Sequence, residues 1–458
     1  MGSQSGAEPI KQYEPDTLIV ESRHEQTVIQ TMGREAAGVE EKDPRLGMSL
    51  IRLGDVEEAA KHVEAEAAVA RAENPNVLPS APDPAWPALD RLLHSLRTVF
   101  SHRYGGWNPE MGKDRTVTHV QFVPYPNVAA PPLAPEPAQL PAPTTAQTAT
   151  ASDPGPGGER VRVALLDTEF YPHSRLAGRY FGPSSLLRPD KKCANGWPYI
   201  LGHAVFTGNL ILDHAPAAEL NVQALVDVKD VNGTRSLWRI AQQMAGYLDS
   251  DAQILNCSWV CYTADGKPPF ALARALALLT PKILVVAAAG NHGKRWDNEY
   301  RVRSGLPKDT YAPAYPAALP NVLAVGALDG KDLPAEFNPR VQTVATGTND
   351  AGEDSTLVPW IDVLAPGVDI TSAYFGDRGE DDVEVPDPQQ PPGAKKTKKF
   401  YGGARWSGTS MSAAIVTGAI AARMADGKTA QCALAELLSD GSSGIRPPRR
   451  EPSSAEQQ

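Results

Sequence analysis

The pattern of apolar and polar positions divides the chain into two folded regions joined by a proline-rich segment. In the first region, residues 16–123, short apolar runs predict strands at 17–20, 46–53 and 116–123. Helical periodicity predicts helices at 23–37, 55–72 and 86–99. Asp55, followed three positions later by Glu58, is typical of a helix start. We therefore expect a small α+β domain at residues 16–123.

The second region, residues 159–440, has a different pattern of short, fully apolar runs separated by helical stretches. The runs predict strands at 161–166, 219–226, 253–257, 283–289 and 322–325. Helices are predicted at 236–249 and 270–279. Strands without polar alternation indicate a sheet that helices cover on both faces. The pattern therefore predicts an α/β domain in three αβα layers with a mainly parallel sheet.

Three other segments lack the pattern of a packed core. Residues 124–158 are rich in Pro, Ala and Thr and poor in large apolar side chains, which predicts an extended linker. Residues 1–15 are predicted to be flexible, and the polar tail at 441–458 is predicted to be disordered.

Residues 376–399, within the second region, are acidic and then basic. They are expected to form an exposed insertion; a partner-binding exosite or a processing site is the alternative.

Composition and charge exclude several classes of protein. The chain has 458 residues and a net charge of −10, which argues against a nucleic-acid-binding surface. No apolar run approaches a membrane span, and the N-terminus lacks the pattern of a secretion signal, so we expect no membrane association and a cytoplasmic location. Four cysteines are too few for a disulfide scaffold, and no loop has the spacing of a metal site. We expect no cofactor and no metal.

Polar residues at the ends of buried elements supply the candidate chemistry. Asp167 ends the strand at 161–166, Asn291 follows the strand at 283–289, and Ser410 opens a helix that continues through 413–424. Each alone is more often a turn or cap residue. In parallel sheets, however, functional side chains gather at the carboxyl ends of strands. Together the three residues offer a nucleophile, an acid that orients a base, and a donor to an oxyanion.

These motifs resemble those of the subtilisin-like serine proteases, the subtilases, over roughly residues 160–424. The resemblance rests on Ser407-Gly-Thr-Ser-Met-Ser-Ala413, Ala287-Ala-Ala-Gly-Asn-His-Gly293 and Val163-Ala-Leu-Leu-Asp-Thr168, which have the order of the family. It implies that Ser410 is the nucleophile, that Asp167 orients the base and that Asn291 is the oxyanion donor. It also implies that substrate pairs as an added strand along Ser258, Trp259 and Val260.

The histidine motif departs from the family pattern of Gly-Thr-His-Val-Ala-Gly. An ungapped overlay places Val205 or Phe206 at the catalytic position, and neither is a base. Gly202-His-Ala-Val-Phe206 resembles a Gly-His-Gly-Thr-Phe pattern of some subtilase-like sequences, which makes His203 the expected base. The alternatives are His173, His214 and His292.

The resemblance implies a serine endopeptidase that forms an acyl-enzyme with a peptide or protein substrate. The alternative is a degenerate subtilase scaffold that binds peptides or proteins without cutting them. An esterase is disfavoured because no G-x-S-x-G motif surrounds Ser410. We expect the N-terminal domain either to resemble an inhibitory pro-segment, which would regulate the enzyme in the same chain, or to recruit a regulator. Removal of residues 1–158 is expected to leave a folded catalytic domain.

Overall fold

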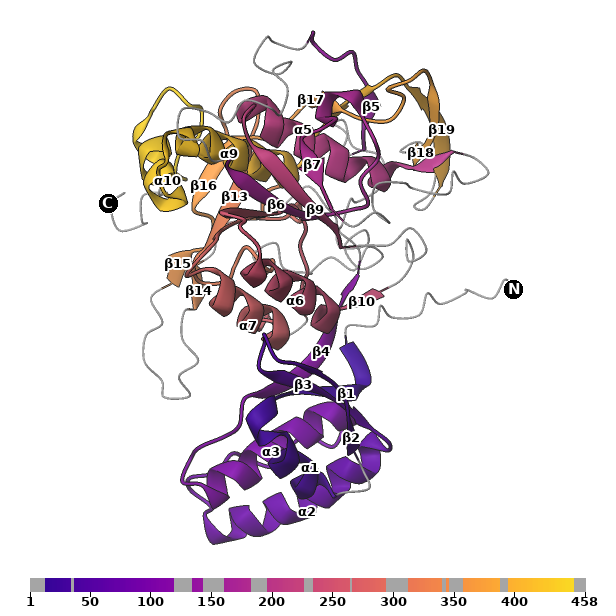
Figure 1. Ribbon diagram of the computed structural model, residues 1–458. Helices are drawn as coiled ribbons and strands as arrows, with labels where there is room; N and C mark the ends of the chain where they lie inside the picture. Colours follow the sequence, from indigo (N-terminus) through magenta and orange to yellow (C-terminus); the bar gives the residue numbers. More distant parts are fainter. Residues whose placement is uncertain are drawn as a thin grey trace, which may run out of the picture. The chain divides into compact units, whose positions relative to one another are not determined.

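The part of the chain that the computed structural model describes falls into two compact units. The described residues are 13–33, 37–118, 134–142, 160–182, 196–225, 234–263, 266–293, 312–339, 343–345, 357–387 and 394–448. The first unit contains the described residues of 1–118 together with 234–248 and 267–278, and the second contains those of the rest of the chain (Figure 1).

A five-stranded antiparallel sheet organises the first unit, in the order β10-β4-β1-β3-β2. The strands are β1 (Tyr13–Glu21), β2 (Ala37–Asp43), β3 (Met48–Leu53), β4 (Met111–Thr118) and β10 (Thr234–Ser236). The helices are α1 (Glu25–Met32), α2 (Val56–Glu73), α3 (Ala88–Arg103), α6 (Leu237–Gly246) and α7 (Phe270–Leu279), with the short η1 (Ser22–His24) and η6 (Tyr247–Asp249). The sequence therefore predicted the α+β character of this region.

Local rules account for most element boundaries in this unit. The Asp55 side chain accepts a hydrogen bond from the Glu58 backbone at 2.9 Å, as the helix-start pattern predicts. Helix α1 is shorter than predicted because Gly33, at φ 94°, ends it. Strand β2 was not predicted: five of its seven residues are Gly or charged, which hides the strand pattern.

The first unit contains helices on both faces of its sheet. Leu18 and Val20 of β1 pack into one core with α1, α2 and α3. Ile19, between them, is fully buried on the opposite face, since successive strand residues alternate. Its cross-strand partner Gly112 lies so close to Phe270 that a Cβ there would be 2.8 Å from the Phe270 Cβ. Helix α7 therefore closes the second face.

The second unit is built on a seven-stranded sheet in which every pairing is parallel. Its order is β16-β13-β12-β11-β6-β9-β7, with bounds β6 (Arg162–Asp167), β7 (Tyr180–Phe181), β9 (Glu219–Ala224), β11 (Ile254–Cys257), β12 (Leu284–Ala288), β13 (Val322–Leu328) and β16 (Val363–Pro366). Strands β11, β12 and β13 are buried throughout, which is why the sequence shows continuous apolar runs. The predicted parallel sheet is confirmed.

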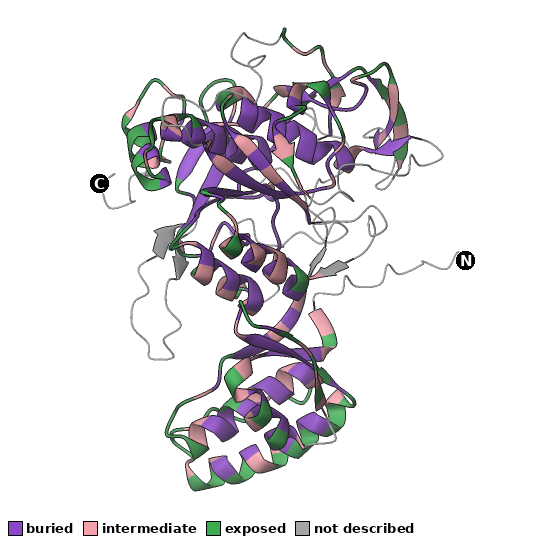
Figure 2. Ribbon diagram, in the orientation of Figure 1, coloured by how far each residue is buried: buried purple, intermediate pink, exposed green. Residues whose placement is uncertain are grey.

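Two helices of the second unit pack closely and run in the same direction. They are α5 (His203–His214) and α9 (Thr409–Arg423). A Cβ on Gly418 would lie 2.7 Å from the His214 Cβ, so the helix backbones approach closely there. Near the other ends, Trp406 packs edge-on against His203 with ring centroids 5.5 Å apart. The N-termini of α5 and α9 therefore lie at the same end of the pair, and Figure 2 shows both helices largely buried.

The remaining described elements are small. One three-stranded sheet has the order β17-β20-β5 and another the order β19-β18-β8, while β14 pairs with β15. The bounds are β5 (Glu136–Pro137), β8 (Trp197–Pro198), β14 (Thr343–Ala345), β15 (Leu357–Pro359), β17 (Ile370–Ala373), β18 (Asp381–Pro386), β19 (Lys395–Phe400) and β20 (Gly403–Trp406). Short helices are η2 (Ser174–Leu176), η4 (Tyr199–Gly202) and η7 (Met424–Asp426), and α10 (Ala430–Ser439) follows them.

Two segments predicted to lack packing contain ordered contacts. Within the predicted linker 124–158, β5 pairs with β20, Ala404 opposite Pro137. Within the predicted disordered tail 441–458, Ile445 is buried and Arg446 forms a backbone bridge with Leu364. The prediction of an unpacked chain does not hold at these positions, because backbone pairing needs little apolar surface. Over the described ranges, no helix has the length and apolar character to cross a membrane.

Candidate active site

Asp167 ends β6, next to the edge where polar residues were expected to gather. Its side chain is 1% exposed and accepts three hydrogen bonds. Oδ1 accepts from Nδ1 of His203 at 2.6 Å and from the Thr168 backbone at 2.7 Å, while Oδ2 accepts from the Thr207 hydroxyl at 3.1 Å. The carboxylate is therefore buried, and hydrogen-bond donors of the protein stabilise it in place of solvent.

His203 is the first residue of α5 and is fully buried. A carboxylate only accepts, so the imidazole proton lies on Nδ1 and Nε2 is the ring nitrogen that can take up a proton. The Thr168 hydroxyl accepts from the Ala204 backbone at 3.1 Å, which binds the first turn of α5 to the end of β6. Thr207, one turn further along α5, was not singled out in the sequence; its spacing of four from His203 is the signal that could have found it.

Ser410 is the second residue of α9, where backbone N–H groups of the first turn have no partner within the helix. The residue is 5% exposed. Its hydroxyl donates to the Ser258 carbonyl at 3.0 Å, and the Ser258 hydroxyl lies 3.2 Å from the Ser410 carbonyl. Ser258 is therefore tied to the start of α9 by two hydrogen bonds.

Asn291 follows β12 and is held by the residue before Ser410. Its Oδ1 accepts from the Thr409 backbone at 3.0 Å and from the Thr409 hydroxyl at 3.1 Å. Thr409 in turn accepts from the Gly290 backbone at 3.0 Å. These bonds fix the side-chain amide with its oxygen on Thr409, and its NH2 group is a donor of the kind that can serve an anion.

The structure thus joins the four expected residues in two pairs: Asp167 with His203, and Asn291 with the start of the helix that carries Ser410. The parallel packing of α5 and α9 brings the helix starts at His203 and Ser410 to one end. The strand-like segment Ser258, Trp259 and Val260 is at most 6% exposed, and Trp259 occupies a core position.

The other histidines considered in the sequence have different partners. His173 contacts the Gly402 carbonyl at 2.9 Å, and its burial lowers its pKa. His214 ends α5, three turns from His203, and burial lowers its pKa as well. His292 lies 3.0 Å from the Tyr262 hydroxyl and 2.8 Å from the Ala312 carbonyl. Of the four histidines considered, His203 is the one that bonds to Asp167 in the described part of the chain.

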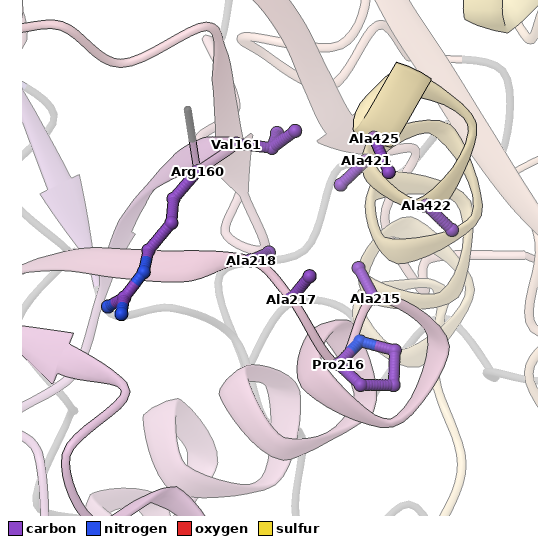
Figure 3. Close-up of a pocket in the computed structure, with 9 residues that line it drawn as sticks. All are labelled: Arg160, Val161, Ala215, Pro216, Ala217, Ala218, Ala421, Ala422 and Ala425. Atoms are coloured by element: carbon purple, nitrogen blue, oxygen red, sulfur yellow. The ribbon is translucent and has the colours of Figure 1, made fainter. Parts of the chain in front are cut away.

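A small cavity lies at the opposite ends of the same two helices. Its volume is about 130 Å³, and Figure 3 shows it between the residues that follow α5 and the last turns of α9. The lining is apolar except for Arg160 and consists of Arg160, Val161, Ala215, Pro216, Ala217, Ala218, Ala421, Ala422 and Ala425. This cavity is therefore separate from the candidate site. The described residues contain no group of three or more His, Cys, Asp or Glu that could hold a metal ion.

Known proteins resemble this chain in sequence and in fold. A family model described as Peptidase_S8, Subtilase family, matches residues 158–431, more than half of the chain. A thermostable alkaline protease of Halalkalibacterium halodurans is 31% identical over 236 residues, which cover 50% of this chain and 54% of that protein. Subtilisin Savinase of Lederbergia lenta is 29% identical over 237 residues, which cover 50% of this chain and 72% of that protein.

The match to the first of these relatives thus spans about half of its length. Among solved structures, fervidolysin from Fervidobacterium pennivorans, a keratinolytic enzyme related to subtilisin, aligns with a TM-score of 0.52. The alignment covers 94% of this chain and 57% of that one at 17% sequence identity, which shows a shared fold.

Proposed function

This chain belongs to the subtilase family, and from that premise we propose that it is a serine endopeptidase that cleaves peptide bonds through an acyl-enzyme. The observation that carries the proposal is the buried contact of 2.6 Å between Nδ1 of His203 and Asp167. This contact supports His203 as the oriented base, although its motif departs from the family pattern.

In the proposed mechanism, the Ser410 hydroxyl turns from the Ser258 carbonyl towards His203 and loses its proton to Nε2 as Oγ attacks the substrate carbonyl. Asp167 stabilises the imidazolium that forms, and its second oxygen stays bound to Thr207. His203 then gives the proton to the leaving amine. A water molecule, activated by the same imidazole, hydrolyses the acyl-enzyme and restores Ser410.

The developing oxyanion needs donors that are already in place. In our proposal the NH2 group of Asn291 is one donor. Two bonds from Thr409 hold the amide oxygen, and so fix the orientation of the side chain. The N-terminus of α9 adds the positive end of a helix dipole at Ser410. The segment Ser258 to Val260 would pair with a peptide or protein substrate as an added strand.

The second candidate is a peptide-binding scaffold that does not cut. One observation favours it: the Ser410 hydroxyl donates to the Ser258 carbonyl. Ser258 and Trp259 are each 1% exposed, so pairing of a peptide strand with that segment requires local opening for either candidate.

We also propose that the N-terminal region regulates the enzyme. Within the first unit, the Asp114 carboxylate accepts from the Ser236 hydroxyl at 2.7 and 2.8 Å, and Glu41 accepts from Trp238 at 3.2 Å and from Gln242 at 2.8 Å. Residues 236–246 lie inside the range that matches the family model. The N-terminal residues therefore bind part of the family-matched sequence directly.

Labelling of the full chain with a fluorophosphonate probe tests the proposed activity. We expect the wild type to be labelled, Ser410→Ala to lose labelling, and His203→Ala to be labelled at least about 1,000-fold more slowly. His292→Ala is the matched control and should keep labelling. An unlabelled wild type would favour the binding scaffold, and labelling that depends on His292 but not His203 would refute the assignment of the base.

A further inference from the structure

The insertion between β17 and β20 has no role in the proposed chemistry, although it contacts the chain on either side of the Asp167–His203 pair. Strands β17 and β20 pair antiparallel, with Ala373 opposite Gly403, so a short turn could join them. Instead the chain extends through residues 374–402 and forms the hairpin of β18 and β19. The sequence predicted an exposed insertion with charge-separated ends here. In the structure, its lysines form ion pairs with nearby carboxylates.

The two faces of this hairpin differ. On the outer side, acidic and basic residues form ion pairs, including Glu384 with Lys395 at 3.5 Å and Glu380 with Lys399. On the inner side, Val383, Val385 and Phe400 are fully buried in the core of the second unit. The hairpin is therefore part of the fold, and its basic strand is neutralised by its own neighbours.

The inner edge of the hairpin holds the segment that leads into His203. Val383 of β18 lies opposite Trp197 of β8 in a parallel pairing, and β8 is followed directly by η4 and His203. The Tyr374 hydroxyl donates to the Tyr199 carbonyl. The Tyr374 ring also lies against Gly202, where a Cβ would be only 2.1 Å from it.

The base of the same insertion holds the loop that follows Asp167. Nε2 of His173 contacts the Gly402 carbonyl at 2.9 Å. The Ser174 backbone and hydroxyl donate to Asp377 at 2.9 and 2.6 Å. The insertion therefore contacts both partners of the Asp167–His203 bond through the chain next to each of them.

One carboxylate connects the two sides. Asp381, the first residue of β18, accepts from the Tyr171 hydroxyl at 2.8 Å on the Asp167 side and from the Trp197 indole at 3.4 Å on the His203 side. It also accepts from the Gly376 backbone at 2.9 Å, which fixes it to the base of the insertion. The rings of Tyr171, Trp197 and Phe375 pack around it, with Trp197 stacked on Phe375 at an interplanar angle of 10°.

We propose that Asp381 is a positioning residue for the catalytic pair: it holds the loop after Asp167 and the segment before His203 in one register. The expected effect on catalysis rests on the proposed function. The expected effect on the Asp167–His203 hydrogen bond does not depend on it. A contact of 2.6 Å between buried groups tolerates little displacement, and misplacement by about 1 Å can cost about 100-fold in rate.

The test compares Asp381→Asn with Glu380→Gln in the full chain. Tyr171 and Trp197 donate to different oxygens of Asp381. Asparagine keeps one acceptor oxygen and has a donating NH2 group in place of the other, so it cannot accept from both. Glu380, the adjacent residue, binds Lys399 and Tyr401 of the insertion itself, and Glu380→Gln therefore controls for hairpin stability. Two readouts are used: kcat and KM for a peptide substrate, and the downfield NMR signal of the His203 Nδ1 proton, assigned by its loss in His203→Ala.

We expect Asp381→Asn to lower kcat about 10- to 100-fold with little change in KM, and to shift or broaden the Nδ1 proton signal. Glu380→Gln should leave both readouts unchanged. Unchanged kcat and an unchanged signal in Asp381→Asn, or equal losses in the two variants, would overturn the proposal. If Asp381→Asn does not fold, Tyr171→Phe, which removes one hydroxyl, is held to the same expectations.

The two proposals fail in different ways. A wild type without turnover removes the proposed function, but the NMR signal still decides whether Asp381 holds the Asp167–His203 bond. A wild type with turnover and an Asp381→Asn variant with normal kcat and a normal signal removes only the positioning role.

Discussion

At the scale of single residues, the site depends on close approaches as much as on its polar groups. Gly202 immediately precedes His203, and the Tyr374 ring occupies the space that a side chain at Gly202 would need. The hydrogen bond to Asp167 holds the imidazole from one side, and the backbone at Gly202 fixes where its helix begins. A methyl group at this position should therefore disturb both stability and the proposed catalysis.

We predict that Gly202→Ala lowers stability by about 1–3 kcal/mol and also lowers the rate of peptide hydrolysis. The reason is that the new Cβ would lie 2.1 Å from Tyr374 Cε2, and the buried ring has no free space to move into. Urea denaturation and kcat measure the two effects.

Gly246→Ala is the control, because nothing lies within 4 Å of a Cβ at that helical position. Alanine there should be neutral or stabilising by up to about 1 kcal/mol. A Gly202→Ala protein that matches the wild type in both measurements would contradict the role we give to this contact.

Residue identity was enough to predict part of the candidate site. Asp167, Asn291 and Ser410 stand in motifs, and Gly-His-Ala-Val-Phe pointed to His203 despite its departure from the usual pattern. Thr207 and Asp381 could not be found in this way. Their roles depend on which side chains tertiary packing brings within hydrogen-bond distance, and Asp381 lies more than 170 residues from Trp197 in the chain.

At the scale of elements, helix α6 shows how the N-terminal sequence binds the family-matched range. Ser236 caps α6, and its hydroxyl also donates to Asp114 of β4. The Trp238 backbone donates to the same carboxylate at 3.2 Å. Burial raises the pKa of Asp114 to about 6 in spite of these donors; the nearby Glu14 adds to the rise and Arg239 opposes it. The contact therefore stabilises the unit most when Asp114 is protonated.

The pH dependence follows from the sign of that shift. The folded pKa of about 6 lies above the ordinary value of 3.8, so the folded protein binds this proton more tightly than the unfolded chain does. The contribution is fully present below about pH 4 and is lost as the pH rises through about 6, with a magnitude on the order of 1–3 kcal/mol. We predict that Asp114→Asn, which stays neutral, is more stable than the wild type at pH 7.5 but not at pH 4.5.

Hydrogen exchange of peptides from β4 and α6 provides the measurement, with variant and wild type compared at the same pH. Asp55→Asn is a suitable control, because asparagine also caps helices and Asp55 lies at the start of α2, away from this contact. Equal destabilisation of Asp114→Asn at both pH values would contradict the raised pKa of Asp114, because the effect of the substitution would then not depend on the protonation of the wild-type carboxyl.

Elements were predicted correctly where local sequence determines them, and were missed where pairing with a neighbouring segment determines them. Helix α7 has the predicted bounds, 270–279, because its sequence has no helix-breaking residue between them. Strand β19, Lys395–Phe400, was not predicted because lysine-rich sequence is unfavourable for strands. It forms because each of its four lysines meets a carboxylate on a neighbouring segment and Phe400 enters the core.

At the scale of the whole molecule, the segments that make up each unit are not contiguous in the sequence. Residues 234–248 and 267–278 cluster with the N-terminal unit, although they lie between strands of the parallel sheet in sequence. Conversely, residues 134–142 of the predicted linker belong to the second unit. Apolar periodicity identifies which segments are buried, but it contains no information about which unit buries them.

The segment 134–142 sets the practical start of the second unit. The Ala138 backbone donates to the Gly403 carbonyl at 3.2 Å, Glu136 pairs with Lys398, and Arg175 binds the Pro141 carbonyl. A Cβ on Gly403 would lie 2.8 Å from Leu140 Cγ, so Leu140 packs directly on β20. Strand β20 leads within four residues to Ser410. Loss of this segment would therefore loosen the strand that precedes the proposed nucleophile.

We predict that a chain starting at Ala134 is more stable than one starting at Glu159, by roughly 5 °C in Tm, as about 2 kcal/mol of lost burial and pairing implies for a unit of this size. Both chains lack the same residues 1–133, so the difference reports on residues 134–158 alone. In the full chain, Leu140→Ala should lower Tm in the same direction, whereas Gln139→Ala, at an exposed position of the same segment, should not. Equal Tm values for the two truncated chains, together with an unaffected Leu140→Ala protein, would mean that the pairing of β5 with β20 contributes nothing measurable to folding. The second unit would then begin at residue 159, as the sequence predicted.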